Sequence, residues 1–581
     1  MKLSDYVMSF IHERGIMHVF GYQGGAVTHL VDSLHKIDGL SYVQNYHEQA
    51  SAFCADAYSR INRNFGVALA TSGPGATNLI TGIANAYFDS IPCLFLTGQV
   101  STHAIKSKSE IRQQSFQETD IVSIVSPITK FAKTIVDPQT IRYYLEKAVF
   151  TATTERPGSV LLDLPHNVQA TDINPESLDS FFDSKEYKAC DRNQNSRIPD
   201  VLREIAGLLS GAKRPLVLAG GGVAALKDRE IFKQMVRAFD LPVVCSLMGL
   251  GAIDHSERHY FGFIGSYGNR HSNMAIAKSD LLLVLGSRLD ERQTGPRRDL
   301  FARNARVIHV DIDPDLLDHH VDTDICVCAD LQSFLSDLLG LAPAEPPDNG
   351  NWINQVHLVA KELATESAHD QDYIDPNHFI RYLSTKLSKD AVVCSDVGQN
   401  MMWVAQSLDM TVDMRLLNSG GHGAMGYSLP AGIGAYCADQ NRQVVCIAGD
   451  GGIQMNIQEL QTIAREGLPI KIIVMNNQSL GMVRGFHEKY FDNKCYGTAL
   501  GYSNPDFSKV ACAFGLEYTK IESKDNFNLL DDGLKGASPH LIEVILSPES
   551  QTIPEPAPGP RGIEDQFPLI DREKLARLLS D

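Results

Sequence analysis

The feature that most constrains this sequence is a strand–helix–strand pattern at residues 444–477. An apolar run, VVCIA, ends in the glycine-rich GDGG, which contains Asp450. A helical pattern, IQMNIQELQTIA, follows, and a second apolar run ends in Asn476 and Asn477. Asp450 and Asn477 are 27 residues apart, a spacing that suits one crossover between neighbouring parallel strands. We therefore expect both side chains at the carboxyl edge of one sheet, where α/β proteins bind ligands.

The residue types at that edge suit a magnesium ion and phosphate groups. Mg²⁺ takes oxygen ligands and is commonly completed by substrate phosphates, so a carboxylate, an amide oxygen and a backbone carbonyl would leave room for two phosphate oxygens. The glycines allow the backbone to approach phosphates closely, and the following helix N-terminus favours an anion. The alternative is a solvated turn beside an unrelated asparagine pair.

Short apolar runs alternate with helical patterns in three blocks, which predicts an α/β fold of three doubly wound parallel sheets. The blocks span residues 1–175, 195–342 and 355–546, and a C-terminal arm spans 547–581. A polar stretch from Asp172 to about Asp200 is predicted to be a linker. The arm contains PEPAPGPRG, which excludes regular structure, and then an apolar pattern that predicts docking on the rest of the chain. The first and third blocks have similar strand content, and a diverged duplication is one explanation.

Composition excludes several classes of protein. The 581 residues carry a net charge of −18, which disfavours a nucleic-acid partner. No apolar run approaches the ~18 residues of a membrane-spanning helix, and the N-terminus does not read as a secretory signal. The 11 cysteines are scattered and often lie in apolar runs, so we expect reduced core residues and a cytoplasmic protein. A metal or redox role for the close pair Cys326 and Cys328 is the alternative for those two.

At this point the sequence resembles thiamine-diphosphate (ThDP) enzymes, and it looks most like the catalytic subunit of acetohydroxyacid (acetolactate) synthases. The similarity covers nearly the whole chain. The resemblance implies pyrimidine-binding, central and diphosphate-binding domains, in that order. The segments that carry it, all collinear, are GYQGGAV, HEQA, ATSGPGATNLITGIANAYFDSIP, SFQETD, ERPGSVLLDLP, GSRLDERQTG, SDVGQNMMW, SGGHGAMGYSLPAGIGA and GDGGIQMNIQEL with MNNQSLGMV.

The resemblance assigns Glu48 as the catalytic glutamate that hydrogen-bonds the cofactor's aminopyrimidine ring. It assigns Met425 as the apolar wedge that bends the cofactor. A helix N-terminal charge and a core methionine are the ordinary alternatives for these two residues. Because Glu48 and Asp450 lie in different domains, the resemblance further implies a homodimer or homotetramer whose active sites need two chains.

The cofactor-binding positions follow from the same motifs. On the pyrimidine side they are Tyr22, Gly24, Gly25, Thr71, Pro74 and Asn78. On the diphosphate side they are Val397, Gly398, Gln399, Asn400, Gly423, Met425, Asp450, Gly451, Gly452, Asn477, Leu480, Gly481 and Met482. The magnesium ligands implied are Asp450, Asn477 and the backbone carbonyl of Ser479.

The resemblance also implies a non-redox FAD in the central domain. The matching positions are Gly221, Gly222, Arg288, Asp290, Arg292, Asp311 and Asp330. One departure bears on this site, because an expected GMHG-like stretch reads Gly265-Ser266-Tyr267-Gly268. A central domain that has lost its nucleotide is the rival interpretation.

Phe116, Gln117 and Arg156 match substrate-channel positions, although Arg156 has a surface salt bridge as its alternative. Three departures bear on the acceptor. Phe486 stands where the family has a tryptophan that selects the second 2-ketoacid, His166 replaces a lysine, and Gln23 replaces a proline. The ending GPRGIEDQFPLIDREKL is also unlike a typical acetohydroxyacid synthase and is similar to ThDP enzymes of sugar pathways.

We therefore expect an enzyme that decarboxylates pyruvate and transfers the two-carbon unit to a carbonyl acceptor. The departures favour a ketone acceptor, such as a nucleotide-linked keto sugar of the yersiniose type. A true acetolactate or acetohydroxybutyrate synthase is the first alternative. A simple 2-ketoacid decarboxylase, a sulfoacetaldehyde-type acetyltransferase and a non-catalytic regulatory paralogue are the others.

Overall fold

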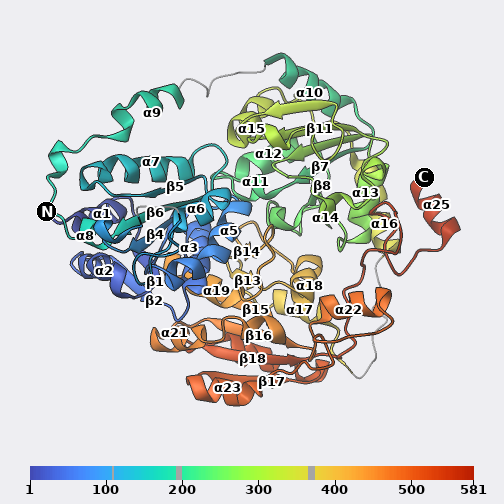
Figure 1. Ribbon diagram of the computed structural model, residues 1–581. Helices are drawn as coiled ribbons and strands as arrows, with labels where there is room; N and C mark the ends of the chain where they lie inside the picture. The colour runs from blue at the N-terminus through green and yellow to red at the C-terminus, as the bar shows by residue number, and fades with distance from the viewer. Residues whose placement is uncertain (107–109, 191–198, 364–372, 581) are drawn as a thin grey trace.

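The computed structural model describes residues 1–106, 110–190, 199–363 and 373–580. Within these residues the strands form three sheets of six strands each, and every neighbouring pair of strands is parallel. Figure 1 shows the three sheets in separate lobes, with the first sheet on the left, the second above right and the third below. This is the α/β fold of three doubly wound sheets that the sequence predicted.

The first and third sheets have the same strand order. Counted from each sheet's own first strand, both run second, first, third, fourth, sixth, fifth. The first sheet consists of β2 (Ser41–Gln44), β1 (His18–Tyr22), β3 (Gly66–Ala70), β4 (Cys93–Gln99), β6 (Ser159–Pro165) and β5 (Phe131–Thr134). The third consists of β14 (Arg415–Leu417), β13 (Val392–Ser395), β15 (Val444–Gly449), β16 (Lys471–Asn476), β18 (His540–Ile545) and β17 (Glu517–Ile521). The shared order is what a diverged duplication would leave.

The second sheet has the strand order of dinucleotide-binding folds. It runs β9 (Tyr260–Phe263), β8 (Val243–Cys245), β7 (Pro215–Ala219), β10 (Leu281–Leu285), β11 (Arg306–Asp311) and β12 (Ile325–Cys328). This is the order 3-2-1-4-5-6, in which ligands bind outside the carboxyl ends of the strands where the order reverses. That point lies between β7 and β10. Both strands are apolar and buried throughout.

Two helices join the first and third lobes. α3 (Glu48–Asn62) packs against α19 (Ser428–Ala438), and one hydrophobic core runs through both lobes. The close contact requires a glycine, because a Cβ on Gly434 would lie 2.1 Å from the carbonyl oxygen of Cys54. α3 therefore has a structural role along its length and presents Glu48 at its N-terminal end.

Part of the predicted linker is folded, which corrects the sequence-based interpretation. Residues 175–190 form two short 3₁₀ turns and α9 (Lys185–Cys190). Phe181 is buried against Phe150 and Tyr143 of α7 (Ile141–Thr153), with ring centroids 5.5 Å apart in both pairs. The aromatic side chains were too irregularly spaced to give a helical pattern. Residues 191–198 of the predicted linker lie outside the described part of the chain.

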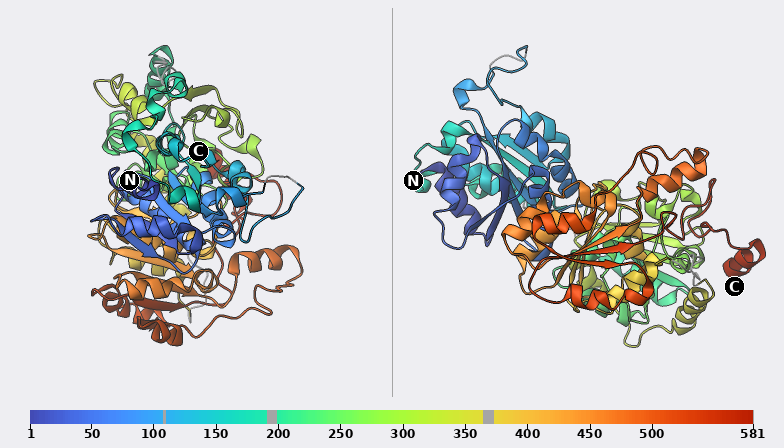
Figure 2. Two further views of the ribbon diagram at one scale, coloured as in Figure 1. Left: turned by 60° about the vertical axis from the view of Figure 1, so that its left-hand side comes forward. Right: turned by 90° about the horizontal axis from the view of Figure 1, so that it is seen from below.

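The C-terminal arm docks on the central lobe, as predicted. Ile563 packs into the core beneath the second sheet, and Leu578 of α25 (Arg572–Ser580) packs beside Met274. The carbonyl oxygens of Ile563 and Gln566 accept hydrogen bonds from Asn273 and Arg270. Figure 1 and the right view of Figure 2 place α25 at the edge of the molecule opposite the N-terminal lobe.

Candidate functional site

Three oxygen atoms meet at the carboxyl edge of β15 and β16. The side-chain oxygen of Asn477 lies 2.9 Å from the carbonyl oxygen of Ser479 and 3.2 Å from Asp450 Oδ1. The amide nitrogen of Asn477 faces away and donates to Gln399 Oε1 at 2.9 Å. All three residues are buried. They are the carboxylate, amide and carbonyl that the sequence predicted as magnesium ligands.

The orientation of the Asn477 amide decides what this cluster can hold. Exchanging its oxygen and nitrogen would let it donate to Ser479 and Asp450, but its oxygen would then face Gln399 Oε1 at 2.9 Å. Turning Gln399 as well would break the bond from its Nε2 to Ser550 O, also 2.9 Å. A small divalent cation relieves the three converging oxygens without either change, because oxygens are the ligands Mg²⁺ prefers. The donor set therefore fits the ion.

Asp450 is fully buried and has a tyrosine hydroxyl among its hydrogen-bond donors. Tyr502 Oη donates to Asp450 Oδ2 at 2.8 Å. Burial raises the pKa of Asp450 to about 6, and the Tyr502 hydrogen bond acts in the opposite direction. A carboxylate with this pKa is charged at neutral pH, and loss of a cation in acid follows from its protonation.

The loop after β13 forms another wall of the site that contains Asp450. Asp396 is fully buried and accepts hydrogen bonds from the backbone nitrogens of Val397, Gly426 and Ser428. Gly398 has φ of +144°, a conformation that favours glycine, and α18 (Gln399–Ser407) begins directly after it. Asn400 donates to the carbonyl oxygen of Asp396 at 2.8 Å. Asp396 thus fixes the chain around a helix N-terminus of the kind that binds phosphates.

Glycines bring this wall close to the metal ligands. A Cβ on Gly481 would lie 1.9 Å from Gln399 Oε1, and one on Gly451 would lie 2.4 Å from Leu480 Cδ2. A Cβ on Gly452 would lie 2.9 Å from Asp396 Oδ1. The predicted residues Val397, Gln399, Asn400, Leu480, Gly481, Gly451 and Gly452 therefore belong to one compact unit with the predicted metal ligands, and Met482 packs against the neighbouring core together with Val397.

Glu48 lies at the carboxyl edge of the first sheet, at the start of α3. Its side chain is buried, and Glu48 Oε2 accepts a hydrogen bond from Asn78 Nδ2 at 2.9 Å. Thr71, which follows β3, accepts from the backbone nitrogen of Ala26 and lies where Gly24 would have its Cβ. Tyr22 ends β1 and is 40% exposed, and Pro74 begins α4 (Pro74–Asn78). The predicted pyrimidine-side residues thus share one edge, with Gly25 in the adjoining turn.

Met425 lies on a loop that a buried ion-pair network holds to the first lobe. Arg60 pairs with Asp56 at 2.7 Å and with Asp89 at 2.9 Å. Asp89 in turn accepts from the backbone nitrogens of Gly420 and Gly421, at 3.1 and 2.7 Å. Met425 itself is half-buried, and unlike Ala424 it is not part of any apolar core in the described chain, which favours the wedge over a core methionine. Gly423 is exposed in the same loop with φ of +71°.

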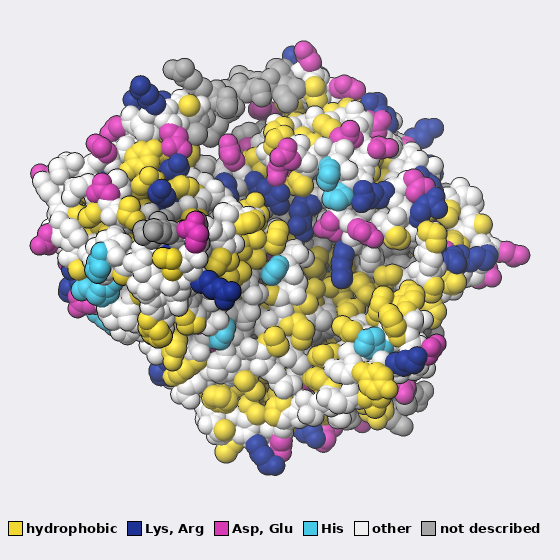
Figure 3. Space-filling view, viewed as in Figure 1, with side chains coloured by type: hydrophobic (Ala, Val, Ile, Leu, Met, Phe, Trp, Pro, Cys, Tyr) yellow, Lys and Arg dark blue, Asp and Glu magenta, His cyan; other side chains and the backbone are white. Residues whose placement is uncertain are grey.

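A cleft of about 3050 Å³ lies at the reversal point of the second sheet and extends between the lobes. Figure 3 shows this face of the molecule hollowed near its centre, with Lys and Arg side chains along the upper part of the hollow. Its glycines permit close contact between strand and loop, since a Cβ on Gly220 would lie 2.1 Å from Gly286 O. The predicted residues Gly221, Gly222, Arg288, Asp290, Arg292, Asp311 and Asp330 all line it.

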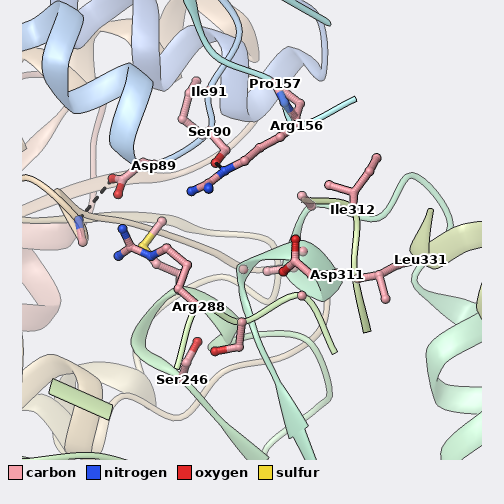
Figure 4. Close-up of a pocket in the computed structure, with 18 of the residues that line it drawn as sticks. Asp89, Ser90, Ile91, Arg156, Pro157, Ser246, Arg288, Asp311, Ile312 and Leu331 are labelled. Atoms are coloured by element: carbon pink, nitrogen blue, oxygen red, sulfur yellow. Dashed lines mark hydrogen bonds between the residues drawn. The ribbon is translucent and has the colours of Figure 1, made fainter. Parts of the chain in front are cut away.

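Arg156 lines the same cleft. Its guanidinium donates to Ser90 Oγ at 2.9 Å and pairs with Asp313 at 2.8 Å, so it bridges the first and central lobes. Figure 4 shows Arg156 and Arg288 reaching into the cleft from different elements. The salt bridge that the sequence left as an alternative describes these contacts, and a substrate role for Arg156 remains a prediction.

The other predicted substrate residues lie on exposed segments. Phe116 is 87% exposed, and Gln117 has φ of +62° and lies against Gly73 in the loop that precedes α4. Phe486 is exposed on α22 (Gly481–Tyr490), with its ring centroid 4.7 Å from that of Tyr490. Their roles toward substrate also remain predictions.

Several site residues were missed in the sequence. Tyr502 has no motif around it, and Asp89 and Arg60 read as ordinary helical charges. Glu459 was also missed: it is fully buried and accepts from Asn45 Nδ2 at 2.9 Å and from Tyr46 N at 2.8 Å, which fixes the segment before Glu48. Asp89 and Glu459 lie within quoted motifs, but their roles, like those of Arg60 and Tyr502, depend on contacts between distant parts of the chain.

The described chain has three parallel α/β sheets, each with predicted site residues at its carboxyl edge, and family models assign each of the three lobes. The N-terminal, central and C-terminal domain models of thiamine pyrophosphate enzymes match residues 1–124, 202–338 and 396–544. The chain belongs to this family and is a ThDP-dependent enzyme.

Its relatives include acetolactate synthase large subunits. The protein from Lactococcus lactis subsp. lactis (strain IL1403) is 37% identical over 558 residues, which is 95% of this chain and 93% of that protein. The isozyme 2 large subunit of Escherichia coli (strain K12) is 34% identical over 560 residues, 96% of this chain and 98% of that protein. The large subunit of Cyanidium caldarium is 35% identical over 553 residues, 94% and 93% of the two chains.

Among the described helices, none has the length and apolar character needed to cross a membrane. In the part of the chain that the structure describes, no three His, Cys, Asp or Glu side chains gather as a metal site. Cys326 and Cys328 are exposed on β12, which corrects their expected place in the core, because β12 is an edge strand.

Proposed function

We propose that this enzyme decarboxylates pyruvate on ThDP and transfers the two-carbon unit to a second carbonyl compound. The observation that carries the proposal is the meeting of Asp450 Oδ1, Asn477 Oδ1 and Ser479 O, three oxygens that would hold a magnesium ion and so help to bind a diphosphate. The thiazolium ring of bound ThDP supplies an electron sink for the decarboxylation. The protein supplies binding, orientation and exclusion of water.

The roles of the protein residues follow from their contacts. Asn78 orients the Glu48 carboxyl, which is placed to exchange a proton with a ring nitrogen of the cofactor. Asp396 fixes the loop that receives the diphosphate, and the Arg60 and Asp89 pair fixes the loop that carries Met425. Both loops are held before the cofactor binds, so little reorganisation is needed during the reaction.

We infer that the active form is a homodimer or a dimer of dimers, with Glu48 of one protomer facing Asp450 of its partner. Large apolar side chains are exposed on the elements that carry each half of the site. Tyr22 and Phe116 lie on the pyrimidine side, and Met455, Val483 and Phe486 lie on the diphosphate side. Exposed apolar groups of this size are typical of interaction surfaces.

FAD is the cofactor we propose for the central cleft. The strand order, the glycine contacts at Gly220 and Gly286, and the arginines at positions 156 and 288 suit a dinucleotide with its phosphates. The stretch Gly265-Ser266-Tyr267-Gly268, which differs from the family pattern, also fits this arrangement. The backbone nitrogen of Ser266 donates to Arg292 O at 2.8 Å and so holds this stretch against the cleft. A flavin absorbance spectrum of the purified protein tests the assignment.

The relatives and the site residues support two different classes of acceptor substrate. The relatives are named as acetolactate synthases, which supports pyruvate or 2-ketobutyrate as acceptor. The exposed Phe486 ring and the half-buried His166, whose ring centroid lies 4.6 Å from that of His29, support a larger ketone such as a nucleotide-linked keto sugar. Phenylalanine is smaller than tryptophan and lacks its N–H donor, so it selects less strongly for a small 2-ketoacid.

The test is a product assay with ThDP, Mg²⁺ and pyruvate, in which CO₂ release and acetolactate are measured before and after addition of 2-ketobutyrate or keto-sugar acceptors. Pyruvate-dependent CO₂ release with a carbon–carbon bond in the product supports the proposal. Acetaldehyde as the main product would instead identify a decarboxylase. Absence of CO₂ release in the fully supplemented assay would contradict the proposal.

A further inference from the structure

Four arginines gather where the three lobes meet, outside the residues assigned above. Arg63 follows α3 in the first lobe, and Arg229 lies in the central lobe after α11 (Gly221–Ala224). Arg415 belongs to β14, and Arg442 precedes β15 in the third lobe. Arg229 Nη1 and Arg415 Nη1 donate to the same oxygen, Val412 O, at 3.1 and 2.9 Å.

The other two arginines also donate to backbone carbonyls near the junction. Arg415 and Arg442 both donate to Asp413 O, and Arg63 Nη1 donates to Lys227 O at 2.5 Å. Arg229 also donates to Gly251 O and Ala224 O. Every one of these acceptors is a neutral backbone carbonyl.

The positive charges are not balanced by carboxylates. Over the described residues, none of the four guanidinium groups has a carboxylate oxygen within the 4.0 Å of an ion pair. Asp413 lies near the arginines with an exposed side chain, and Asp254 Oδ1 accepts a hydrogen bond from Val412 N. Burial and the neighbouring arginines lower the pKa of Arg229 to about 9 and that of Arg415 to about 10. Like charges crowded in this way destabilise the junction unless an anion joins them.

The group also keeps donors free and faces open space. Arg229 Nε is buried without a hydrogen-bond partner. Arg415 uses only Nη1, although a guanidinium has five N–H donors. Arg63, Lys227, Arg229 and Arg415 all line the cleft between the lobes. Planar arrays of arginine donors suit phosphate oxygens, which they bind in pairs of charge-assisted hydrogen bonds.

We propose that this junction binds a small phosphate-bearing anion, and that the bound anion fastens the three lobes together. Arg63, Arg229 and Arg415 supply one set of donors from each lobe, so a single phosphate contacts all three. These arginines line the same cleft as Arg156 and Arg288, but their hydrogen bonds go to other partners. Occupancy stabilises the arrangement in which α3 and β14 flank the central lobe.

The probe is inorganic phosphate, added to the full-length protein already saturated with ThDP, Mg²⁺ and FAD. Binding is measured by calorimetry, and the unfolding midpoint is followed in phosphate and in chloride at equal ionic strength. Arg63→Gln and Arg415→Gln test the site, and Arg203→Gln, an exposed residue paired with Asp200, serves as the matched control. Arg63 is exposed and has a single hydrogen bond, so its variant is expected to fold.

The proposal predicts saturable phosphate binding and a midpoint that rises with phosphate but not with chloride. Each of the two test variants should weaken binding by about tenfold, the effect of losing one charge-assisted contact, and the control should not. Equal binding by Arg63→Gln and the wild type would overturn the proposal. So would loss of phosphate binding on saturation with FAD, because the arginines would then belong to the dinucleotide site.

Discussion

Arg60 lies between two buried carboxylates. Its replacement by methionine is the sharpest test of how the loop that carries Met425 is held. Arg60 Nε is 2.7 Å from Asp56 and its Nη2 is 2.9 Å from Asp89. The two carboxylates are 0% and 1% exposed, so Arg60→Met leaves both charges buried without their cationic partner. Breaking a buried pair by removing one partner costs about 3–5 kcal/mol.

The loss depends on pH in a direction the structure fixes. Burial already raises the pKa of Asp56, and Arg60 is the main influence that lowers it. Without Arg60 the folded-state pKa of Asp56 rises further above its unfolded value. A raised folded-state pKa contributes stability at low pH that is lost as pH rises through it. The difference between variant and wild type should therefore be larger at pH 8 than at pH 5.

The assay is urea unfolding of the cofactor-free protein at both pH values, compared at the first transition because a three-lobed chain need not unfold in one step. Arg203→Met, which removes an exposed ion pair, is the control and should change stability by less than about 0.5 kcal/mol. ThDP affinity should also fall in Arg60→Met, because Asp89 holds Gly420 and Gly421. A loss below about 1 kcal/mol at pH 8, or an equal loss at both values, would refute the reasoning.

Three further predictions concern the cofactor and acceptor. The hydrogen bond from Tyr502 lowers the pKa of Asp450, so Tyr502→Phe should raise that pKa. Magnesium affinity in titrations with ThDP should therefore fall more at pH 6 than at pH 8. An equal fall at both pH values would contradict this. Gly481→Ala places a methyl group 1.9 Å from Gln399 Oε1 and should weaken ThDP binding at least tenfold by calorimetry, whereas Gly485→Ala, with open space around it, should not. Phe486→Trp should raise kcat/KM for 2-ketoacid acceptors relative to ketones, and an unchanged ratio would remove Phe486 from acceptor selection.

The sequence predicted the parts of this protein that are written in local patterns. Continuous apolar runs such as those at 444–449 and 471–476 became buried central strands, and Asp450 and Asn477 met at their ends. The edge strands β5, β9, β14 and β17 were missed, because each has few residues and two of them are only partly buried along their length. A strand that pairs on one side needs no continuous apolar run.

The contacts that support the site could not be predicted from the sequence, for a different reason. Asp89 and the loop at 420–421 are separated by more than 300 residues, and Tyr502 reaches Asp450 from a loop of irregular structure. Their side chains are common in helices and loops, so only the packing of α3 against α19 and the path of the chain after α22 give them a role. The four arginines at the lobe junction are likewise scattered between residues 63 and 442.

The central claim is that each active site joins Glu48 of one protomer to Asp450 of another, and complementation measures this most directly. Glu48→Gln and Asp450→Asn each abolish pyruvate turnover when expressed alone. Co-expression in equal amounts should restore about a quarter of wild-type activity, because half of the dimers are mixed and each mixed dimer has one intact site. Pyruvate turnover no greater than that of the separate variants, in a preparation shown to contain mixed dimers, would contradict the account.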